Sequence, residues 1–417
     1  ARVKELYQIA ADACKAVIEK RQNGLLDNYD QLFRDLGNQT YNKETMLEYG
    51  WYGENATDVR TGYVNGIPTS GNDNSEGGMG KGGSQMMAYP TLFFDYDKDD
   101  QRRDVSVCNY GIVLSAKGNK YQMNTYNGMG VGKYRINWKK EMGATNSKRN
   151  INFPLLRYAD VLLMYAEALN EVNNGPTQEA INAVKEVRKR AFRGDEAKAA
   201  AGIPTNHDDF LTFIQKERKL ELSNEGLRRT DLTRWGKQYE MLMAEKQRLV
   251  NLAKRDGEFA NVPVYRAYYL STTPKFEDPT IALSYIDLSQ ADVEALGLSA
   301  DQIKTLKILN SSSKGSLKDV KLYEKDGKLY SAVNKPEGAV EHSYTILNMF
   351  SIVSIKQKGN LCVEDVTGVS SNNAWITGNS GVFYGLQKNM TELMPFNTSK
   401  ILDVNAGLEG QQHPAYK

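Results

Sequence analysis

Apolar residues recur at helical spacing through the middle of this chain. In the run YADVLLMYAEALNE, apolar or small side chains occupy too many faces for a helix with one wet side, which predicts a central, buried helix from about Phe153. A turn with Gly175 and Pro176 follows. The next segment carries one apolar stripe, which predicts a second, amphipathic helix and therefore a two-helix hairpin; the stripe is formed by Ala180, Ile181, Val184, Val187 and Ala191.

Further helical segments flank this hairpin. Residues 208–224 predict a third helix, a basic turn ends at Trp235 and Gly236, and another helix continues to about Arg255 before Gly257. Residues 1–20 also have helical periodicity. The hairpin looks like a tetratricopeptide repeat unit, which cannot bury its faces alone, so we expect helices 1–20 and 208–224 to stack against it. The pattern predicts a mainly α fold.

Outside the predicted helices, the residue composition and the hydrophobic pattern change. Residues 31–151 are rich in Gly, Asn and Tyr and predict loops with short strands, whereas residues 258–390 predict an appended subdomain of strands and loops. In VKLYEKDGKLYSAV, Asp326 and Gly327 between alternating runs predict a β-hairpin, because a tight turn needs residues that tolerate positive φ. We therefore divide the chain into the end of a helical-repeat region (1–30) and a larger region (31–417), which comprises segments 31–151, 152–257, 258–390 and 391–417.

Composition narrows the classes of function. The 417 residues include 53 basic and 51 acidic side chains and 40% hydrophobic residues, which is typical of a folded globular protein. A net charge of +2 supplies no excess of cations for a nucleic-acid backbone, so we expect no nucleic-acid partner. The longest apolar runs are much shorter than the roughly 20 residues that a membrane-spanning helix needs.

The sequence predicts no metal site and no cofactor. Three cysteines and three histidines lie far apart, and Cys14 and Cys108 are best interpreted as small buried hydrophobic residues. The aspartates in DYDKDDQRRD have the alternate spacing of a calcium loop, but Asp100 stands at the required glycine and Ser106 at the closing glutamate. The run GMGVGK lacks the Ser or Thr of a P-loop, and we interpret it as a flexible loop.

Carboxylates at helical spacing are the candidates for acid–base chemistry. A glycosidase needs two carboxylates from separate elements, and pairs on one helix rarely serve. We interpret them instead as partners of arginines that hold buried helix ends in register. The carboxylates are Glu167, Glu171, Glu217, Glu221 and Glu225, and the arginines are Arg157, Arg218, Arg228 and Arg229.

Aromatic residues are the remaining chemical resource. The chain has 24 Tyr and 4 Trp, and flat amphipathic rings bind sugar faces or peptide side chains at low entropic cost. Density of aromatic residues, and proximity to the glycine-rich segment 66–87, select five candidate ligand-binding residues. They are Tyr52, Tyr63, Tyr121, Tyr134 and Trp138. We expect Trp235, at a helix end against Gly236, to pack rather than to bind.

The order of motifs resembles the SusD/RagB family of surface nutrient-binding lipoproteins. PLLRYADVLLMYAEALNE is similar to the central helix of the family, and IQKERKLELSNEGLRRTDLTRWG is similar to its helix, loop and basic turn. LMPFNTSKILDVNAGLEGQQHPAYK resembles its terminal segment, with the ending altered to QQHPAY. TMLEYGWYG, YPTLFFDYDKDDQRRD and KYRINW precede the central helix in the usual order of the family.

The resemblance implies a SusD-like helical superhelix and a protein that is not an enzyme. It implies an outer-membrane lipoprotein, facing the extracellular side, that captures a glycan or in some members a peptide. It also implies a partner, a SusC-like TonB-dependent transporter, over which the protein closes as a lid. The alternatives are a carbohydrate-active hydrolase and a helical-repeat scaffold that binds only protein.

The chain starts at Ala1 within a helical pattern, without a lipid-acceptor cysteine. We expect an N-terminal region, with the lipid anchor and earlier repeats, to lie upstream and to pack against this first helix. Membrane attachment is expected only through such an anchor, which this chain does not contain.

Overall fold

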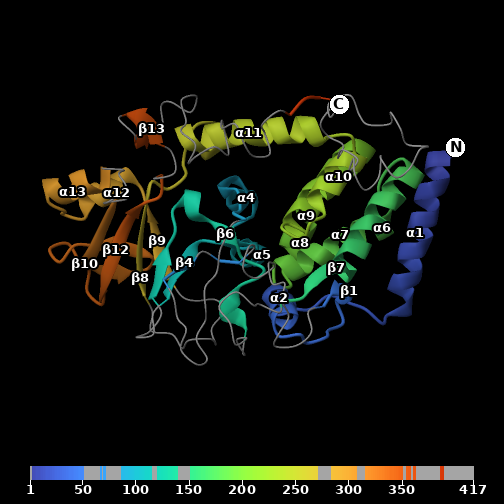
Figure 1. Ribbon diagram of the computed structural model, residues 1–417, viewed down its shortest axis with the longest axis horizontal. Coiled ribbons are helices and arrows are strands. Elements are labelled where there is room, and N and C mark those ends of the chain that lie inside the picture. The colour runs from blue at the N-terminus through green and yellow to red at the C-terminus, as the bar shows by residue number, and fades with distance from the viewer. Residues whose placement is uncertain are drawn as a thin grey trace, which may run out of the picture.

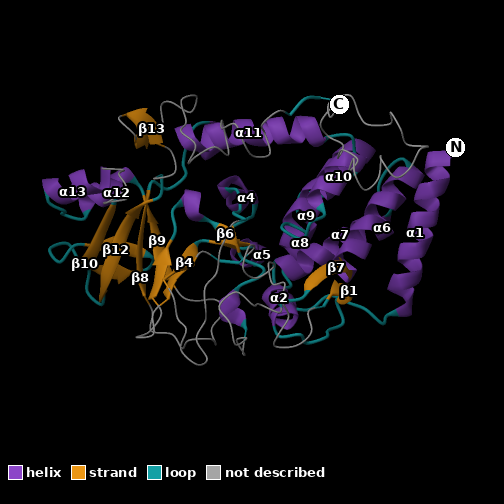
Figure 2. Cartoon of the chain, in the orientation of Figure 1, coloured by secondary structure: helices purple, strands orange, loops and turns teal. Residues whose placement is uncertain are grey.

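The computed structural model has helices at one end of the molecule and a β-sheet at the other (Figures 1 and 2). Among the described residues, no helix is long and apolar enough to cross a membrane. The structure describes residues 2–50, 66–67, 69–71, 86–114, 120–139, 151–270, 283–307, 315–350, 354–357, 360–362 and 386–388.

Four helices lie side by side in the helical half (Figure 1). They are α1 (Arg2–Lys20), α6 (Tyr158–Asn173), α7 (Gln178–Ala191) and α9 (His207–Glu221). Helix α6 contacts the other three and is buried on most of its faces, as its apolar pattern predicts. The predicted hairpin and its two stacking helices are therefore confirmed.

Side-chain caps fix where these helices begin. The side chain of Thr177 accepts a hydrogen bond from the backbone of Ala180 at the start of α7, and Asn206 caps α9 through the backbone of Asp209. Helix α6 ends at Asn174, whose φ of 50° lies in the left-handed region. A short helix, α8 (Glu196–Ala200), connects α7 to α9.

Helix α1 packs on α6 through one face and exposes another. Ala11 and Cys14 are buried against α6. Val3, Leu6 and Ile9 are 67%, 57% and 59% exposed.

A strand precedes α6 where the sequence pattern predicts helix. Strand β7 (Phe153–Arg157) pairs antiparallel with β1 (Thr45–Tyr49), so α6 begins at Tyr158 rather than near Phe153. Pro154 disfavours helical geometry at the residue before it, and exposed Leu155 alternates with buried Pro154. The prediction of helix over these five residues was wrong.

The basic turn forms α10 (Arg228–Arg234), and α11 (Gln238–Lys254) runs from the helical half toward the sheet (Figure 1). Helix α11 contacts α4 (Pro90–Asp95) and the short η3 (Gly257–Phe259). Its end agrees with the predicted stop before Gly257.

The segment between the first helix and β7 holds short elements rather than loops alone. Helices α2 (Tyr29–Gly37) and α5 (Arg102–Ser106) were not predicted, and most of their residues are buried. The other elements are β2 (Thr69–Gly71), β3 (Val107–Cys108), β4 (Tyr110–Leu114), β5 (Lys120–Met123), η1 (Tyr126–Gly128), β6 (Gly130–Val131) and η2 (Ile136–Trp138). Strands β2, β4 and β5 form one small sheet, and β3 pairs with β6.

The glycine run GMGVGK is not a flexible loop. Its last four residues are buried, and a Cβ at Gly132 would overlap the carbonyl oxygen of Val105. Lys133 inserts its ammonium group into the core. The glycine permits close backbone approach, a role that a flexible-loop interpretation overlooked.

The sheet at the other end has the antiparallel order β11-β10-β12-β8-β9. Asp326 and Gly327 have φ of 51° and 72°, as the predicted hairpin turn requires. The core of this subdomain lies between the sheet and two short helices, α12 (Gln290–Ala295) and α13 (Ala300–Lys307). The strands are β8 (Tyr265–Leu270), β9 (Leu283–Leu288), β10 (Ser316–Lys325), β11 (Lys328–Tyr330) and β12 (Val340–Asn348), followed by the separate pair β13 (Ser354–Gln357) and β14 (Asn360–Cys362).

Candidate functional site

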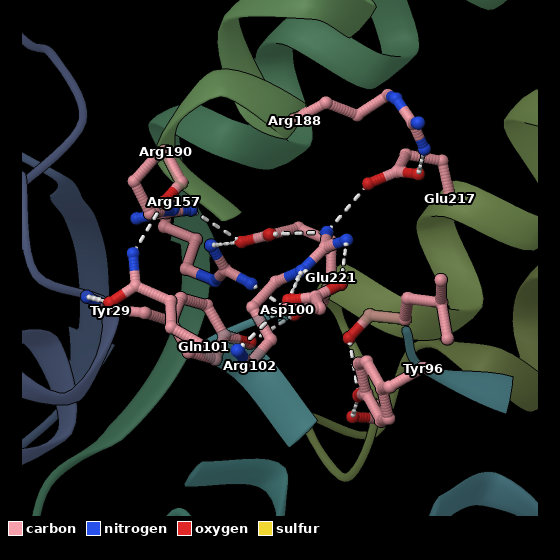
Figure 3. Close-up of polar contacts among 12 residues, drawn as sticks. Tyr29, Tyr96, Asp100, Gln101, Arg102, Arg157, Arg188, Arg190, Glu217 and Glu221 are labelled. Atoms are coloured by element: carbon pink, nitrogen blue, oxygen red, sulfur yellow. Dashed lines mark hydrogen bonds and ion pairs between the residues drawn. The ribbon is translucent and has the colours of Figure 1, made fainter. Parts of the chain in front are cut away.

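A buried network of arginines and carboxylates joins the helical half to the short elements before it (Figure 3). Arg157 donates from Nη1 to Glu221 at 2.5 Å and to Glu44 at 3.0 Å, and from Nε to Glu225 at 2.7 Å. Arg190 donates to the same Glu44 and Glu221 at 2.9 and 2.7 Å. All five side chains are almost completely buried, so this network is closed to solvent.

A third arginine extends the network. Arg102 donates to Asp100 at 2.7 Å, to Glu217 at 2.6 Å and to Glu221 at 3.1 Å. Glu217 and Glu221 lie one turn apart on α9, which places both carboxylates on one face of that helix. The network therefore connects α5, α7, α9 and the β7–α6 junction.

The charges in this network are mutually compensated. Burial alone would raise the pKa of Glu221, but Arg190, Arg157 and Arg102 lower it well below its usual range. Burial lowers the pKa of Lys133 to about 8, although its ammonium donates to Glu225 at 2.6 Å. The ring of Tyr29 lies 4.8 Å from the guanidinium of Arg190 and covers the network from the α2 side.

This chemistry does not suit acid–base catalysis. A general acid of a glycosidase needs a raised pKa and access to substrate, whereas Glu221 and Glu225 have lowered pKa values and are buried. The interpretation of Glu217, Glu221 and Glu225 as structural partners of arginine is confirmed.

A second cluster lies beside α10. Arg218 donates to Asp160 at 2.6 Å and to Asp231 at 2.9 Å, so it is a structural ion-pair partner as expected, but of two aspartates rather than of the predicted glutamates. Glu167 pairs with Arg234 and accepts the indole N–H of Trp235 at 2.9 Å. The half-buried Trp235 thus packs at a helix end, as predicted.

Three other residues differ from the expectation. Glu171 contacts His207 at 3.0 Å, and Arg229 is exposed. Arg228 donates from Nη1 to the carbonyl oxygen of Gln215 at 3.0 Å rather than to a carboxylate. These residues do not belong to the predicted set of arginine–carboxylate pairs.

The alternating aspartates engage different partners. Asp95 contacts Lys219 at 2.5 Å and Arg248 at 2.7 Å, and Asp99 contacts Lys198. Asp97 accepts the backbone N–H of Asp99 at 2.8 Å. Across the part of the chain that the structure describes, no cluster of three or more His, Cys, Asp or Glu side chains is placed to hold a metal ion.

Two of the five candidate ligand-binding aromatics are core residues. Tyr134 and Trp138 are 1% and 3% exposed. The ring of Tyr134 stacks on Phe153 at 5.6 Å, and the guanidinium groups of Arg34 and Arg135 each lie 4.7 Å from the Trp138 ring. Because these rings are buried by protein groups, the structure contradicts their assignment to an open platform.

Of the other three candidates, only Tyr121 belongs to the described residues. Tyr121 is half-buried on β5, with its ring 5.7 Å from that of Tyr110, and burial raises its pKa to about 12. Tyr52 and Tyr63 lie outside the described residues. No described contact brings Tyr121 together with Tyr134 or Trp138.

A cleft between α4, α10 and α11 was missed by sequence reasoning. It has a volume of about 400 Å³, and most of its wall is apolar. Its lining residues come from segments 86–92, 218–232 and 241–245. The apolar runs YPTLFF and YEMLM are the signals present in the sequence, but nothing in either run indicates that they face each other.

Comparisons with known proteins agree with the motifs. The sequence model of the SusD family matches residues 39–293. SusD-like protein P25 of Formosa agariphila is 27% identical over 264 residues, which are 55% of this chain and 46% of that protein. SusD-like protein P2 of the same organism is 31% identical over 162 residues, which are 37% of this chain and 32% of that protein.

A solved structure supports the fold. A SusD homologue from Bacteroides thetaiotaomicron aligns with a TM-score of 0.53 and 29% identity, over 58% of this chain and 50% of that chain. The predicted mainly α, SusD-like fold class is therefore confirmed. This chain spans about half the length, or less, of these relatives.

Proposed function

This chain belongs to the SusD family, and from that premise we propose that it captures a glycan at the cell surface without changing it chemically. The observation that carries this proposal is the family match over residues 39–293. The closed ion network supports the noncatalytic part, because Glu217, Glu221 and Glu225 are already bound to arginines.

The proposal includes a place and a partner. The protein acts on the extracellular side of the outer membrane, to which a lipid anchor attaches it. It delivers ligand to a SusC-like TonB-dependent transporter. Both statements rest on membership of the family. They concern the whole protein, and this chain covers about half the length of a relative such as SusD-like protein P25.

The ligand contacts are proposed on three aromatic residues. Tyr121 is half-buried, whereas Tyr134 and Trp138 are buried and are no longer candidates. Tyr52 and Tyr63 complete the proposal. Their tyrosine rings can stack on a sugar face while the hydroxyl groups form hydrogen bonds.

A glycan and peptide array tests the ligand class. We expect binding to a set of oligosaccharides, and weaker binding of that set by Tyr121→Ala at an unchanged melting temperature. Trp138→Ala serves as the contrast, because loss of a buried ring lowers the melting temperature. Binding to peptides alone would replace the glycan with a peptide ligand.

Incubation with the bound oligosaccharides tests the absence of catalysis. We expect intact oligosaccharide after prolonged incubation, whereas cleavage would favour the hydrolase alternative. Pulldown from outer-membrane extracts tests the partner. Recovery of a TonB-dependent barrel is expected, and recovery of a soluble complex without a barrel would favour the scaffold alternative.

A further inference from the structure

One charged residue of the apolar cleft beside α10 has no ion-pair partner among the residues that the structure describes. Five charged residues are among those that line it, and four of them have an oppositely charged partner within 4 Å. Arg218 pairs with Asp231, which also pairs with Arg234. Lys219 contacts Glu245 at 3.4 Å, in addition to Asp95.

Arg228 is the fifth charged residue. Its guanidinium donates to the Gln215 carbonyl oxygen and lies 5.7 Å from the centre of the Trp235 ring, but no carboxylate of the described chain pairs with it. Burial lowers the pKa of Arg228, with Asp231 opposing that shift only in part. In contrast, the pKa values of Arg102, Arg157 and Arg190 are raised by their carboxylate partners.

The other residues that line the cleft favour binding of a hydrocarbon group. Leu92, Leu222, Leu232 and Leu242 line the cleft, and Met86 and Met241 are partly exposed at its edge. Methionine side chains adapt to irregular apolar ligands. The volume of about 400 Å³ lies in the range of small-molecule sites, which is roughly 300–1,000 Å³.

Two polar lining residues are already engaged. Ser223 Oγ shares a hydrogen bond of 3.1 Å with the Tyr96 hydroxyl, and Asn224 donates to the Ser106 carbonyl oxygen at 3.3 Å. A sugar or a peptide backbone in this cleft would leave many of its own polar groups without partners, which is costly. A ligand with a hydrocarbon body and a single anionic group avoids that cost.

We propose that the cleft between α4, α10 and α11 binds a small aliphatic carboxylate, with the hydrocarbon chain against the leucines and methionines and the carboxylate on Arg228. This site is independent of the proposed glycan capture, so either one can fail without the other.

Decanoate is the test ligand, and its uncharged analogue 1-decanol separates the charge from the chain. Affinities are measured by displacement of a fluorescent naphthalenesulfonate from the full chain. We expect decanoate to bind with a dissociation constant below about 1 mM and more tightly than decanol. Arg228→Met should weaken decanoate at least about tenfold, the scale of one charge-assisted hydrogen bond, and change decanol by less than about twofold.

Two further variants keep the test decisive. Arg229→Met removes a neighbouring exposed arginine that does not line the cleft and should bind decanoate as the wild type does. Met241→Trp, which places a larger ring at the edge, should weaken decanoate and decanol alike. Three results would overturn the proposal. The first is equal decanoate affinity in the wild type and a folded Arg228→Met, and the second is no binding of decanoate to the wild type at concentrations up to about 1 mM. The third is tighter binding of N-acetyl-Leu-Leu than of decanoate.

Discussion

Arg157 and Arg228 both contact α9, but their guanidinium groups have opposite surroundings. Arg157 is buried and contacts three glutamates, whereas Arg228 is half-buried in the wall of an apolar cleft and contacts a backbone carbonyl. Where every charge has a partner, the charges hold elements in register. Where one charge has no ion-pair partner among the described residues, as at Arg228, we propose a place for an anionic ligand.

The comparison between the two arginines predicts the largest loss of stability for a substitution at the centre of the buried network. Glu221→Gln removes the charge shared by Arg102, Arg157 and Arg190, so we expect the free energy of unfolding to fall by about 3–5 kcal/mol in chemical denaturation. Glu19→Gln is the matched control, because that carboxylate is 66% exposed and lies 3.9 Å from Lys15. It should change stability by less than about 0.5 kcal/mol. A similar loss of unfolding free energy in both variants would contradict the claim that buried ion pairs stabilise the fold more than exposed ones.

Acid should break the same network. The folded-state pKa values of Glu221 and Glu225 lie below their unfolded values, so the unfolded chain binds more protons below about pH 4.5. The stability that these groups contribute is present above that pH and is lost as the pH falls toward the folded pKa. We expect the wild-type unfolding free energy to decrease between pH 5 and pH 3 and the decrease to be smaller in Glu221→Gln. Parallel pH profiles would contradict this assignment.

A buried carboxylate whose arginine partner is partly exposed should respond less. Glu167 contacts Arg234, whose side chain is 35% exposed, and accepts the Trp235 indole N–H. Glu167→Gln keeps an acceptor for the indole, so we expect a loss of about 1 kcal/mol by the same denaturation assay. A loss as large as that of Glu221→Gln would show that burial of the ion pair does not determine how much unfolding free energy is lost.

Apart from the Glu19→Gln control, the smallest effect on stability is expected at the cleft. Arg228→Met retains the apolar stem of the side chain and removes a hydrogen bond to one carbonyl group. Its unfolding free energy should stay within about 1 kcal/mol of the wild type. A loss above about 3 kcal/mol would place Arg228 in the scaffold instead.

The sequence was sufficient for the long helices because their signals are local. Periodic apolar stripes and the caps at Thr177 and Asn206 lie within a few residues of the elements that they determine. Helical spacing also indicated that Glu217 and Glu221 share one face. The identity of their partners was only partly accessible, since Arg102, which donates to both, is far away in the chain.

Burial by distant segments explains most of what sequence reasoning missed. Trp138 resembles a binding residue in isolation, but Arg34 and Arg135 lie over its ring. Gly132 and Lys133 looked like part of a mobile loop, but they pack against Val105 and Glu225. The cleft needs three segments at once, so no single run of residues predicts it.

The most direct test measures unfolding free energy and decanoate affinity on the wild type, Glu217→Gln and Arg228→Met. Glu217 is buried between Arg102 and Arg188 and does not line the cleft. We expect Glu217→Gln to lose about 3 kcal/mol or more and to bind decanoate normally. Arg228→Met should keep its stability and lose at least about tenfold in affinity. The reverse pattern, with Arg228→Met unstable and its decanoate affinity unchanged, would contradict the distinction between the two regions.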